Sequence, residues 1–346
     1  MEDKQCLSAS LDLCRHKSAE RINMKLGVFS PVLAQMSFKE MVEYLSSLGV
    51  DQLEMGAGGY PGKAHFDPEV LLADDTKIEE IKQILDDNNM SIAAISCHGN
   101  PVHPNKKIAD EYHRDFENAV LLAEKLGVTT MVGFSGCPGD CETSTRPNWV
   151  TCSWPNDYLE TLDWQWNEVL IPYWKKEAEF CKAHGIEKIA FEMHPGFCVY
   201  NTSSLLKLRN AVGDIIGANV DPSHLLWQRM DPVEVIKVLG KENAIHHFNA
   251  KDTKIDSANT SVNGVLDVGS YADLLGRSWV FRTVGYGNGK EMWNNIISTL
   301  KAVGYEGVIS IEHEDALMSP KEGLEKAIAF LKDVIIYESP AEMWWI

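Results

Sequence analysis

The sequence predicts an α/β protein with the (β/α)8 (TIM) barrel fold in a single domain. Strand-like apolar runs alternate with segments of helical periodicity, and the runs begin near Lys25, Val50, Ser91, Val128, Ile186, Ile215, Ala244 and Gly307. Strands that alternate with helices form parallel sheets, and eight repeats in 346 residues favour a closed barrel over an open sheet. No GxGxxG motif follows the first strand, which counts against a dinucleotide-binding fold.

Helix starts can be read between these strands. Residues 37–40 (SFKE) and 76–79 (TKIE) have the spacing of capping boxes. Residues 231–232 and 319–320 place a proline directly behind a capping side chain, which is typical of the first helical position. These signals predict four of the helices that connect the strands.

The chain divides into a barrel domain, residues 24–337, and two short tails. The tail at residues 1–23 is charged and lacks the apolar segment of a secretory signal. The tail at residues 338–346 ends in two tryptophans and an isoleucine, which we expect to pack on the barrel or on a second subunit.

Two connections are long, those after strands 4 and 7. Residues 137–167 contain four tryptophans, and residues 253–290 form the second connection. Both follow the carboxyl end of a strand, so we expect both on the catalytic face of the barrel. Long structured loops there often form a lid or a substrate wall, and the tryptophans either line such a wall or pack within the loop.

The net charge of −18 argues against partners that carry phosphate backbones. We therefore expect no nucleic acid and no anionic membrane surface, and no apolar run approaches the ~20 residues of a membrane span. The eight cysteines lack the spacing of a disulfide framework, so a reducing, cytoplasmic location is expected.

Acidic and imidazole side chains follow the last four predicted strands, where each strand ends. They are Glu192 and His194, then Asp221 and His224, then His247, Asn249 and Lys251, and finally Glu312. Because side chains alternate along a strand, we expect the carboxylates to converge inside the mouth of the barrel. Each alone is better explained as a solvated residue past a strand end, but four successive strands favour a bound cation. Oxygen-rich ligands suit Mn²⁺ or Mg²⁺, with Co²⁺ or Zn²⁺ as substitutes, and we expect Mn²⁺.

This pattern resembles the xylose-isomerase-like superfamily of sugar isomerases and epimerases, in particular its ketose 3-epimerase, inosose dehydratase and C-glycoside deglycosidase-like branch. The resemblance covers roughly residues 24–335 and is carried by Glu192, the Asp221-x-x-His224 motif, the run at 247–252, and Glu312. It implies that Glu192, Asp221, a histidine and Glu312 bind one Mn²⁺-like ion. It also implies that Glu192 and Glu312 are catalytic and stand on either side of the reacting carbon.

The sequence departs from the family pattern at one ligand. The family's histidine lies three residues before an acidic residue, and here that position is Asn249, before Asp252. Either Asn249 coordinates through its amide oxygen, or His247 reaches the metal, or metal binding is weakened. We expect His247, because imidazole is the stronger ligand.

Further polar residues at the predicted mouth are candidates for substrate binding. The resemblance implies a substrate contact for His224, and the others are His194, His98, Glu54, Lys251 and Arg282. Lys251 either stabilises an enediolate or forms an ion pair with a carboxylate, and the ion pair is the commoner role.

The expected chemistry begins with a metal that polarises a sugar carbonyl. One glutamate then removes the neighbouring proton, giving a metal-bound enediolate, and the other returns a proton to the opposite face. This is epimerisation; return to the adjacent carbon is isomerisation, and loss of a β-leaving group is elimination. The prediction is a divalent-metal-dependent isomerase or epimerase of an unphosphorylated sugar or keto-sugar, and a homo-oligomer.

Three alternatives accompany this prediction. The first is a lyase that cleaves 3-keto-glycosides through the same enediolate, whose relatives can require a small second subunit. The second is a repair nuclease like endonuclease IV, which the acidic charge and the lack of histidines between His247 and His313 disfavour. The third is a barrel that has lost its metal and only binds or assembles, a hypothesis that rests on Asn249.

Overall fold

The computed structural model describes residues 23–338, 343, 345 and 346. Its centre is a closed barrel with the strand order β1-β10-β7-β6-β5-β4-β3-β2, and every neighbouring pair of these strands is parallel. The barrel strands are β1 (Lys25–Phe29), β2 (Gln52–Gly59), β3 (Ser91–His98), β4 (Thr130–Gly133), β5 (Lys188–Glu192), β6 (Ile216–Val220), β7 (Ile245–Ala250) and β10 (Val308–Ile311). The predicted (β/α)8 barrel is confirmed.

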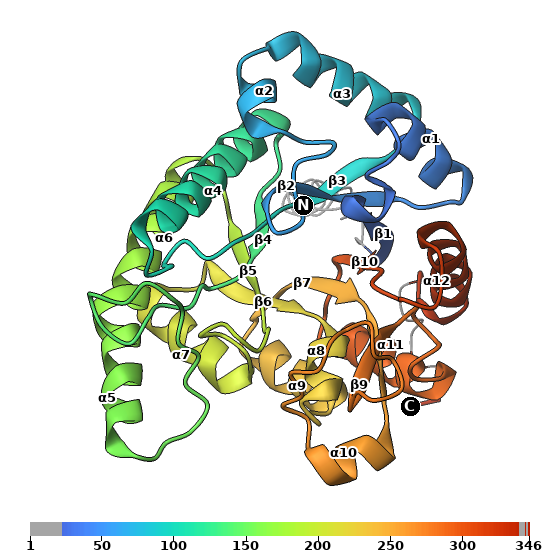
Figure 1. Ribbon diagram of the computed structural model, residues 1–346. Helices are drawn as coiled ribbons and strands as arrows, with labels where there is room; N and C mark the ends of the chain where they lie inside the picture. Colours follow the sequence, from blue (N-terminus) through green and yellow to red (C-terminus); the bar gives the residue numbers. More distant parts are fainter. Residues whose placement is uncertain (1–22, 339–342, 344) are drawn as a thin grey trace, which may run out of the picture.

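Helices surround the strands on the outside of the barrel (Figure 1). They are η1 (Ser30–Leu33), α1 (Phe38–Ser47), α2 (Pro68–Leu72), α3 (Asp75–Asp87), α4 (Lys106–Leu126), α5 (Asn156–Trp164), η2 (Gln165–Leu170), α6 (Ile171–Ala183), α7 (Thr202–Val212), α8 (Pro222–Trp227), α9 (Pro232–Lys241), α10 (Ser257–Asn263), α11 (Lys290–Ala302) and α12 (Pro320–Val334). The main apolar core lies between strands and helices, where residues such as Leu26, Ile309, Ile297 and Leu331 are fully buried. A small second cluster, Ala94, Val132 and Ala190, is separate from it.

Most of the predicted helix starts are present. Ser37 and Glu40 form a capping box at α1, while Asp231 and Ser319 cap α9 and α12 ahead of a proline. The predicted box at residues 76–79 is wrong. Asp74 caps α3 instead, because its carboxylate accepts the backbone N–H of Thr76 and the helix begins before that residue.

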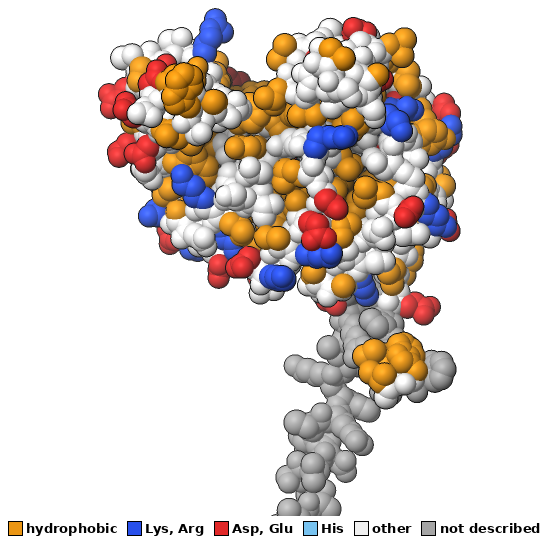
Figure 2. Space-filling view, turned by 90° about the horizontal axis from the view of Figure 1, so that it is seen from below, with side chains coloured by type: hydrophobic (Ala, Val, Ile, Leu, Met, Phe, Trp, Pro, Cys, Tyr) orange, Lys and Arg blue, Asp and Glu red, His pale blue; other side chains and the backbone are white. Residues whose placement is uncertain are grey.

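The two long connections both carry additional structure. The one after β4 contains α5 and the π-helical turn η2. The one after β7 contains an antiparallel ribbon of β8 (Asp252–Ile255) and β9 (Trp279–Arg282), with α10 between the two strands. Viewed from below, the molecule shows two lobes on either side of a hollow, on the side away from the grey residues (Figure 2). On this face lysine and arginine side chains are scattered among acidic ones and form no continuous basic stripe.

Most of the two predicted tails lies outside the described residues. Residues 1–22, 339–342 and 344 belong to this part of the chain. Among the residues that the structure does describe, no helix combines the length and the apolar character that a membrane span requires.

Candidate active site

Inward-facing polar residues form two groups inside the barrel, and Glu54 on β2 is the centre of the first. Its carboxylate is fully buried. It accepts hydrogen bonds from Ser96 Oγ at 2.5 Å, Asn249 Nδ2 at 2.7 Å, Ser310 Oγ at 2.7 Å and His247 Nε2 at 2.9 Å. Burial raises the pKa of Glu54, but the charge of His247 and these hydrogen bonds outweigh burial and lower it to about 2. Glu54 therefore stays ionised at neutral pH.

This first group contains His247 and Asn249, the two residues that the sequence predicts as alternatives for the fourth metal ligand. His247 donates from Nε2 to Glu54, and Asn249 donates to Glu54 while its Oδ1 accepts from Asn219. Both polar atoms of the Asn249 amide are thus in use. His247 and Asn249 thus have their partners in the Glu54 group, and their role as metal ligands stays a prediction.

The second group lies one step beyond the strand ends and consists of Glu192, Asp221 and Glu312. Glu192 ends β5, Asp221 follows β6 as the N-cap of α8, and Glu312 follows β10. The closest carboxylate oxygens of the three all lie within 4.8 Å of one another. His224, one turn into α8, places Nε2 2.8 Å from Glu192 Oε1 and 3.2 Å from Asp221 Oδ2.

Lys251, the residue after β7, contributes an ammonium to this second group. Its Nζ lies 3.0 Å from Glu312 Oε1, 3.2 Å from Asp221 Oδ2 and 3.2 Å from Glu314 Oε2. Burial lowers the pKa of Lys251, but the surrounding carboxylates raise it well above its usual range. Lys251 is thus a permanent cation, and the carboxylates around it outnumber it.

Several buried atoms of this group lack a hydrogen bond of good geometry. They are Asp221 Oδ2, Glu312 Oε2 and His224 Nε2, although Lys251 Nζ lies 3.2 Å from Asp221 Oδ2 and Glu192 Oε1 lies 2.8 Å from His224 Nε2. His224 Nε2 and Asp221 Oδ2 approach one another at 3.2 Å without the geometry of a hydrogen bond. Buried polar atoms are normally paired, and carboxylate oxygens that converge with an imidazole fit a divalent cation. The residues present therefore fit a metal held by Glu192, Asp221 and Glu312 beside His224.

The surroundings shift the pKa values of Glu192 and Glu312 in opposite directions. Burial raises the pKa of Glu192, but the adjacent imidazoles of His224 and His98 and the charge of Lys251 outweigh it, so its pKa lies well below the usual range. Burial and the negative charges of Glu192, Glu314 and Asp221 raise the pKa of Glu312 well above its usual range, although Lys251 lowers it in part. Two carboxyl groups whose pKa values are driven apart are suited to act as base and acid.

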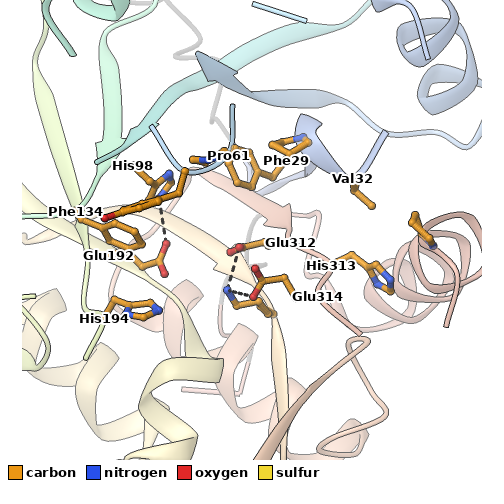
Figure 3. A pocket seen from close by; sticks show the side chains of 14 residues that line it. Phe29, Val32, Pro61, His98, Phe134, Glu192, His194, Glu312, His313 and Glu314 are labelled. Carbon is orange, nitrogen blue, oxygen red and sulfur yellow. Dashed lines mark hydrogen bonds and ion pairs between the residues drawn. The ribbon is translucent and has the colours of Figure 1, made fainter. Parts of the chain in front are cut away.

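A cavity of about 400 Å³ opens onto these side chains (Figure 3). His98 and Glu192 lie on one side, and Glu312 and Glu314 on the other, with dashed lines marking the His98–Glu192 contact and the ion pairs to Lys251. Its lining is Phe29, Pro31, Val32, Tyr60, Pro61, His98, Phe134, Glu192, His194, Lys251, Glu312, His313, Glu314 and Pro320. A cavity lined by both carboxylates and aromatic rings suits a polar ring compound such as a sugar.

The remaining predicted substrate-binding residues fall into different places. His98 lies 3.1 Å from Glu192 Oε2, and His194 lines the cavity while Nδ1 donates to the carbonyl of Pro195. Arg282 instead pairs with Asp315 at 3.0 Å and is absent from the lining. The tryptophans of residues 137–167 are absent from it too.

Sequence reasoning missed the aromatic wall of the cavity. Phe134 stacks on Phe197 at 4.1 Å and meets His98 edge-on at 4.7 Å. Tyr60 is 60% exposed at the rim. The available signal was position, because Phe134 follows directly after β4 and Tyr60 after β2, on the same face as the carboxylates.

The family model for the xylose isomerase-like TIM barrel matches residues 42–334. The chain belongs to this family. A relative of unknown function, the uncharacterized protein YfiH of Bacillus subtilis (strain 168), is 38% identical over 315 residues, which cover 90% of this chain and 99% of YfiH. The family assignment confirms the resemblance and indicates an enzyme.

Solved structures share the fold at low identity. The IolI protein with a bound zinc atom is 18% identical, with a TM-score of 0.63 and coverage of 92% of this chain and 100% of its own. A probable 3-DHS dehydratase, AsbF of Bacillus anthracis, is 17% identical with a TM-score of 0.64, and the match covers 89% and 99% of the two chains. A D-psicose 3-epimerase solved with D-fructose is 15% identical with a TM-score of 0.56, and covers 90% and 99%.

Proposed function

We propose that this protein is a divalent-metal-dependent isomerase or epimerase of a sugar or keto-sugar. The observation that carries the proposal is the opposition of Glu192 and Glu312 across one cavity, with pKa values driven in opposite directions. A reaction that removes a proton from carbon and returns one needs a base and an acid of this kind. The likeness to a D-psicose 3-epimerase supports the fold on which such a site is built.

The proposed metal ligands are Glu192, Asp221 and Glu312, with His224 as the neighbouring imidazole. This set is dominated by carboxylate oxygen, which favours Mn²⁺ and also suits Mg²⁺ or Co²⁺, while the zinc in IolI makes Zn²⁺ a further candidate. When bound, the ion would polarise the substrate carbonyl and so acidify the adjacent C–H.

In the proposed reaction Glu192 is the base, because its neighbours His98 and His224 keep it ionised. It takes the proton from the carbon beside the carbonyl. Glu312, which lines the same cavity, donates a proton to the other face of that carbon. Proton removal and return on opposite faces invert the centre.

Lys251 and the aromatic wall have supporting roles in this proposal. The Lys251 ammonium lies 3.0 Å from Glu312 Oε1 and lines the cavity, so it is placed to stabilise negative charge that develops on a substrate oxygen. Phe134 and Tyr60 also line the cavity, and the apolar face of a sugar ring would pack against their rings.

Exchange of substrate hydrogen with solvent tests the proposal. The metal-replete protein is incubated in D₂O with a panel of keto-sugars, and deuterium at the carbon beside the carbonyl is followed by NMR. We expect uptake at one carbon for at least one member of the panel, and none with protein treated with a chelator. Absence of uptake across hexuloses, pentuloses and keto-glycosides would overturn the proposal.

A further inference from the structure

A second cavity of about 420 Å³ adjoins the proposed active site. It is lined by His194, Tyr271, Leu274, Val280, Phe281, Glu314 and Ala316. His194 and Glu314 line the first cavity as well, so the two spaces meet at these side chains. The first cavity holds the carboxylates and the ammonium, whereas the other walls of the second are formed by apolar and aromatic side chains.

Phe281 on β9 lines the second cavity and lies beside the carboxylate group. Its ring centroid lies 4.9 Å from Lys251 Nζ and 5.4 Å from the ring of His224, which belong to the carboxylate group. The ring of Tyr271 stacks against Phe281 at 6.2 Å with an angle of 22° between the planes. The aromatic surface of the second cavity therefore begins next to Lys251 and His224 of the carboxylate group.

The second cavity is held in shape by packing within the insertion that follows β7. The ring of Trp279 stacks on Trp227 of α8 at 4.5 Å, with 9° between the planes. The guanidinium of Arg277 lies 4.3 Å from the Tyr271 ring and 4.6 Å from the Trp279 ring, and its Nε donates to the carbonyl of Trp279. Preformed apolar walls beside convergent polar groups are the usual anatomy of a ligand pocket.

Hydrogen bonds to Asp252 hold the end of this insertion next to the barrel. Its Oδ2 accepts the backbone N–H groups of Gly285, Gly287 and Asn288 at 2.9 to 3.1 Å, and its Oδ1 accepts from the Asn288 side chain at 2.7 Å. Asp252 begins β8, directly after Lys251. The aromatic walls are thus positioned from the same strand end that carries the ammonium.

We propose that the second cavity binds an aromatic or other apolar group attached to the sugar, so that the substrate is a keto-glycoside and not a free sugar. This inference rests on the proposed function, because it assumes that the first cavity holds the sugar ring. The apolar group would pass between His194 and Glu314 and pack against Phe281, Tyr271 and Val280. Burial of an aromatic ring on such walls contributes affinity that a small substituent does not supply.

The test compares two unreactive probes, phenyl β-glucoside and methyl β-glucoside, which differ in the substituent alone. Dissociation constants are measured by NMR titration on the full chain loaded with Mg²⁺, which avoids paramagnetic broadening. We expect the phenyl probe to bind at least about tenfold more tightly than the methyl probe. In Val280→Asp and Tyr271→Ala that ratio should fall to about one, whereas Tyr158→Ala, an exposed tyrosine on α5 that lines neither cavity, should keep it.

The outcomes separate this inference from the function on which it rests. Equal dissociation constants for both probes on the native protein would overturn the proposal that the second cavity binds an apolar group. The proposed sugar site in the first cavity would be unaffected. Failure of both probes to bind overturns the sugar site and this inference together. If Val280→Asp changes the oligomeric mass in light scattering and leaves the binding ratio intact, the apolar walls belong to a contact between copies of the chain, which also overturns the inference.

Discussion

The ammonium of Lys251 lies 3.2 Å from Oδ2 of Asp221, among the carboxylates that we propose as metal ligands. Nζ also lies 3.0 Å from Glu312 Oε1. A bound divalent ion would therefore either share these oxygens with the Lys251 ammonium or displace the ammonium toward Glu314. Either arrangement means that Lys251 opposes metal binding through charge repulsion and through competition for the same ligand atoms.

Replacement of Lys251 by methionine is expected to raise the affinity for Mn²⁺ by about tenfold or more, because like charges at this separation interact by several kcal/mol inside a protein. Isothermal titration with Mn²⁺ measures this directly, independently of turnover. Lys254→Met, which removes an exposed lysine three residues away, is the matched control and should bind like the native chain. Unchanged or weaker binding in Lys251→Met would show that the ammonium and the metal do not compete.

Asp221 should make the metal-free protein less stable as the pH rises. Burial and the charge of Glu192 raise the pKa of Asp221 from 3.8 to about 7, although Lys251 lowers it in part. A folded-state pKa above the unfolded one means that the native state binds more protons between pH 4 and 7, so the free energy of unfolding falls across this window. Chemical denaturation of chelated protein at several pH values should show this fall. Asp221→Asn should reduce the slope, and an identical slope would contradict the account.

Glu192→Gln and Glu312→Gln are expected to lower turnover by at least about a hundredfold, since each removes one proton-transfer group. The changes keep side-chain size, so circular dichroism should show an intact fold. Glu306→Gln, an exposed glutamate just before β10, should turn over like the native protein. Near-native turnover in either active-site variant would remove the assigned acid and base roles.

His247→Gln is expected to leave the metal content unchanged and to reduce stability. The imidazole donates to the buried Glu54 carboxylate at 2.9 Å, so its loss weakens a buried charged hydrogen bond, at a cost of about 2–4 kcal/mol. Metal analysis and urea denaturation of the same preparation separate the two effects. Loss of metal with unchanged stability would show that His247 is a metal ligand.

Much of the fold and the carboxylate group could be predicted from strand ends. Glu192, Asp221 and Glu312 each follow a run of buried apolar residues, and the closed barrel brings such positions to one mouth. Parity also placed His247, Asn249 and Lys251 on one face of β7. The alternation of side chains along a strand cannot tell which of these three residues lies level with the carboxylates, because that depends on the stagger of neighbouring strands. In the structure Lys251 contacts the carboxylates, whereas His247 contacts Glu54.

The sequence patterns could not predict the structure within the long connections. The ribbon of β8 and β9 pairs residues about thirty positions apart, such as Asp252 with Arg282, and no local periodicity reports such a pairing. The wall formed by Phe281 and Tyr271 depends on that ribbon. The tryptophans after β4 were predicted either to line a substrate wall or to pack within the loop, and none of them lines the first cavity.

The metal content of protein purified without chelator, measured by mass spectrometry beside the Glu192→Ala variant, tests the central claim most directly. Glu192, Asp221 and Glu312 bring carboxylate oxygens within 4.8 Å of one another, so the account predicts about one divalent ion per chain, lost in the variant. Equal metal in both proteins, or none in the native chain after incubation with Mn²⁺, Mg²⁺, Co²⁺ and Zn²⁺, would contradict it.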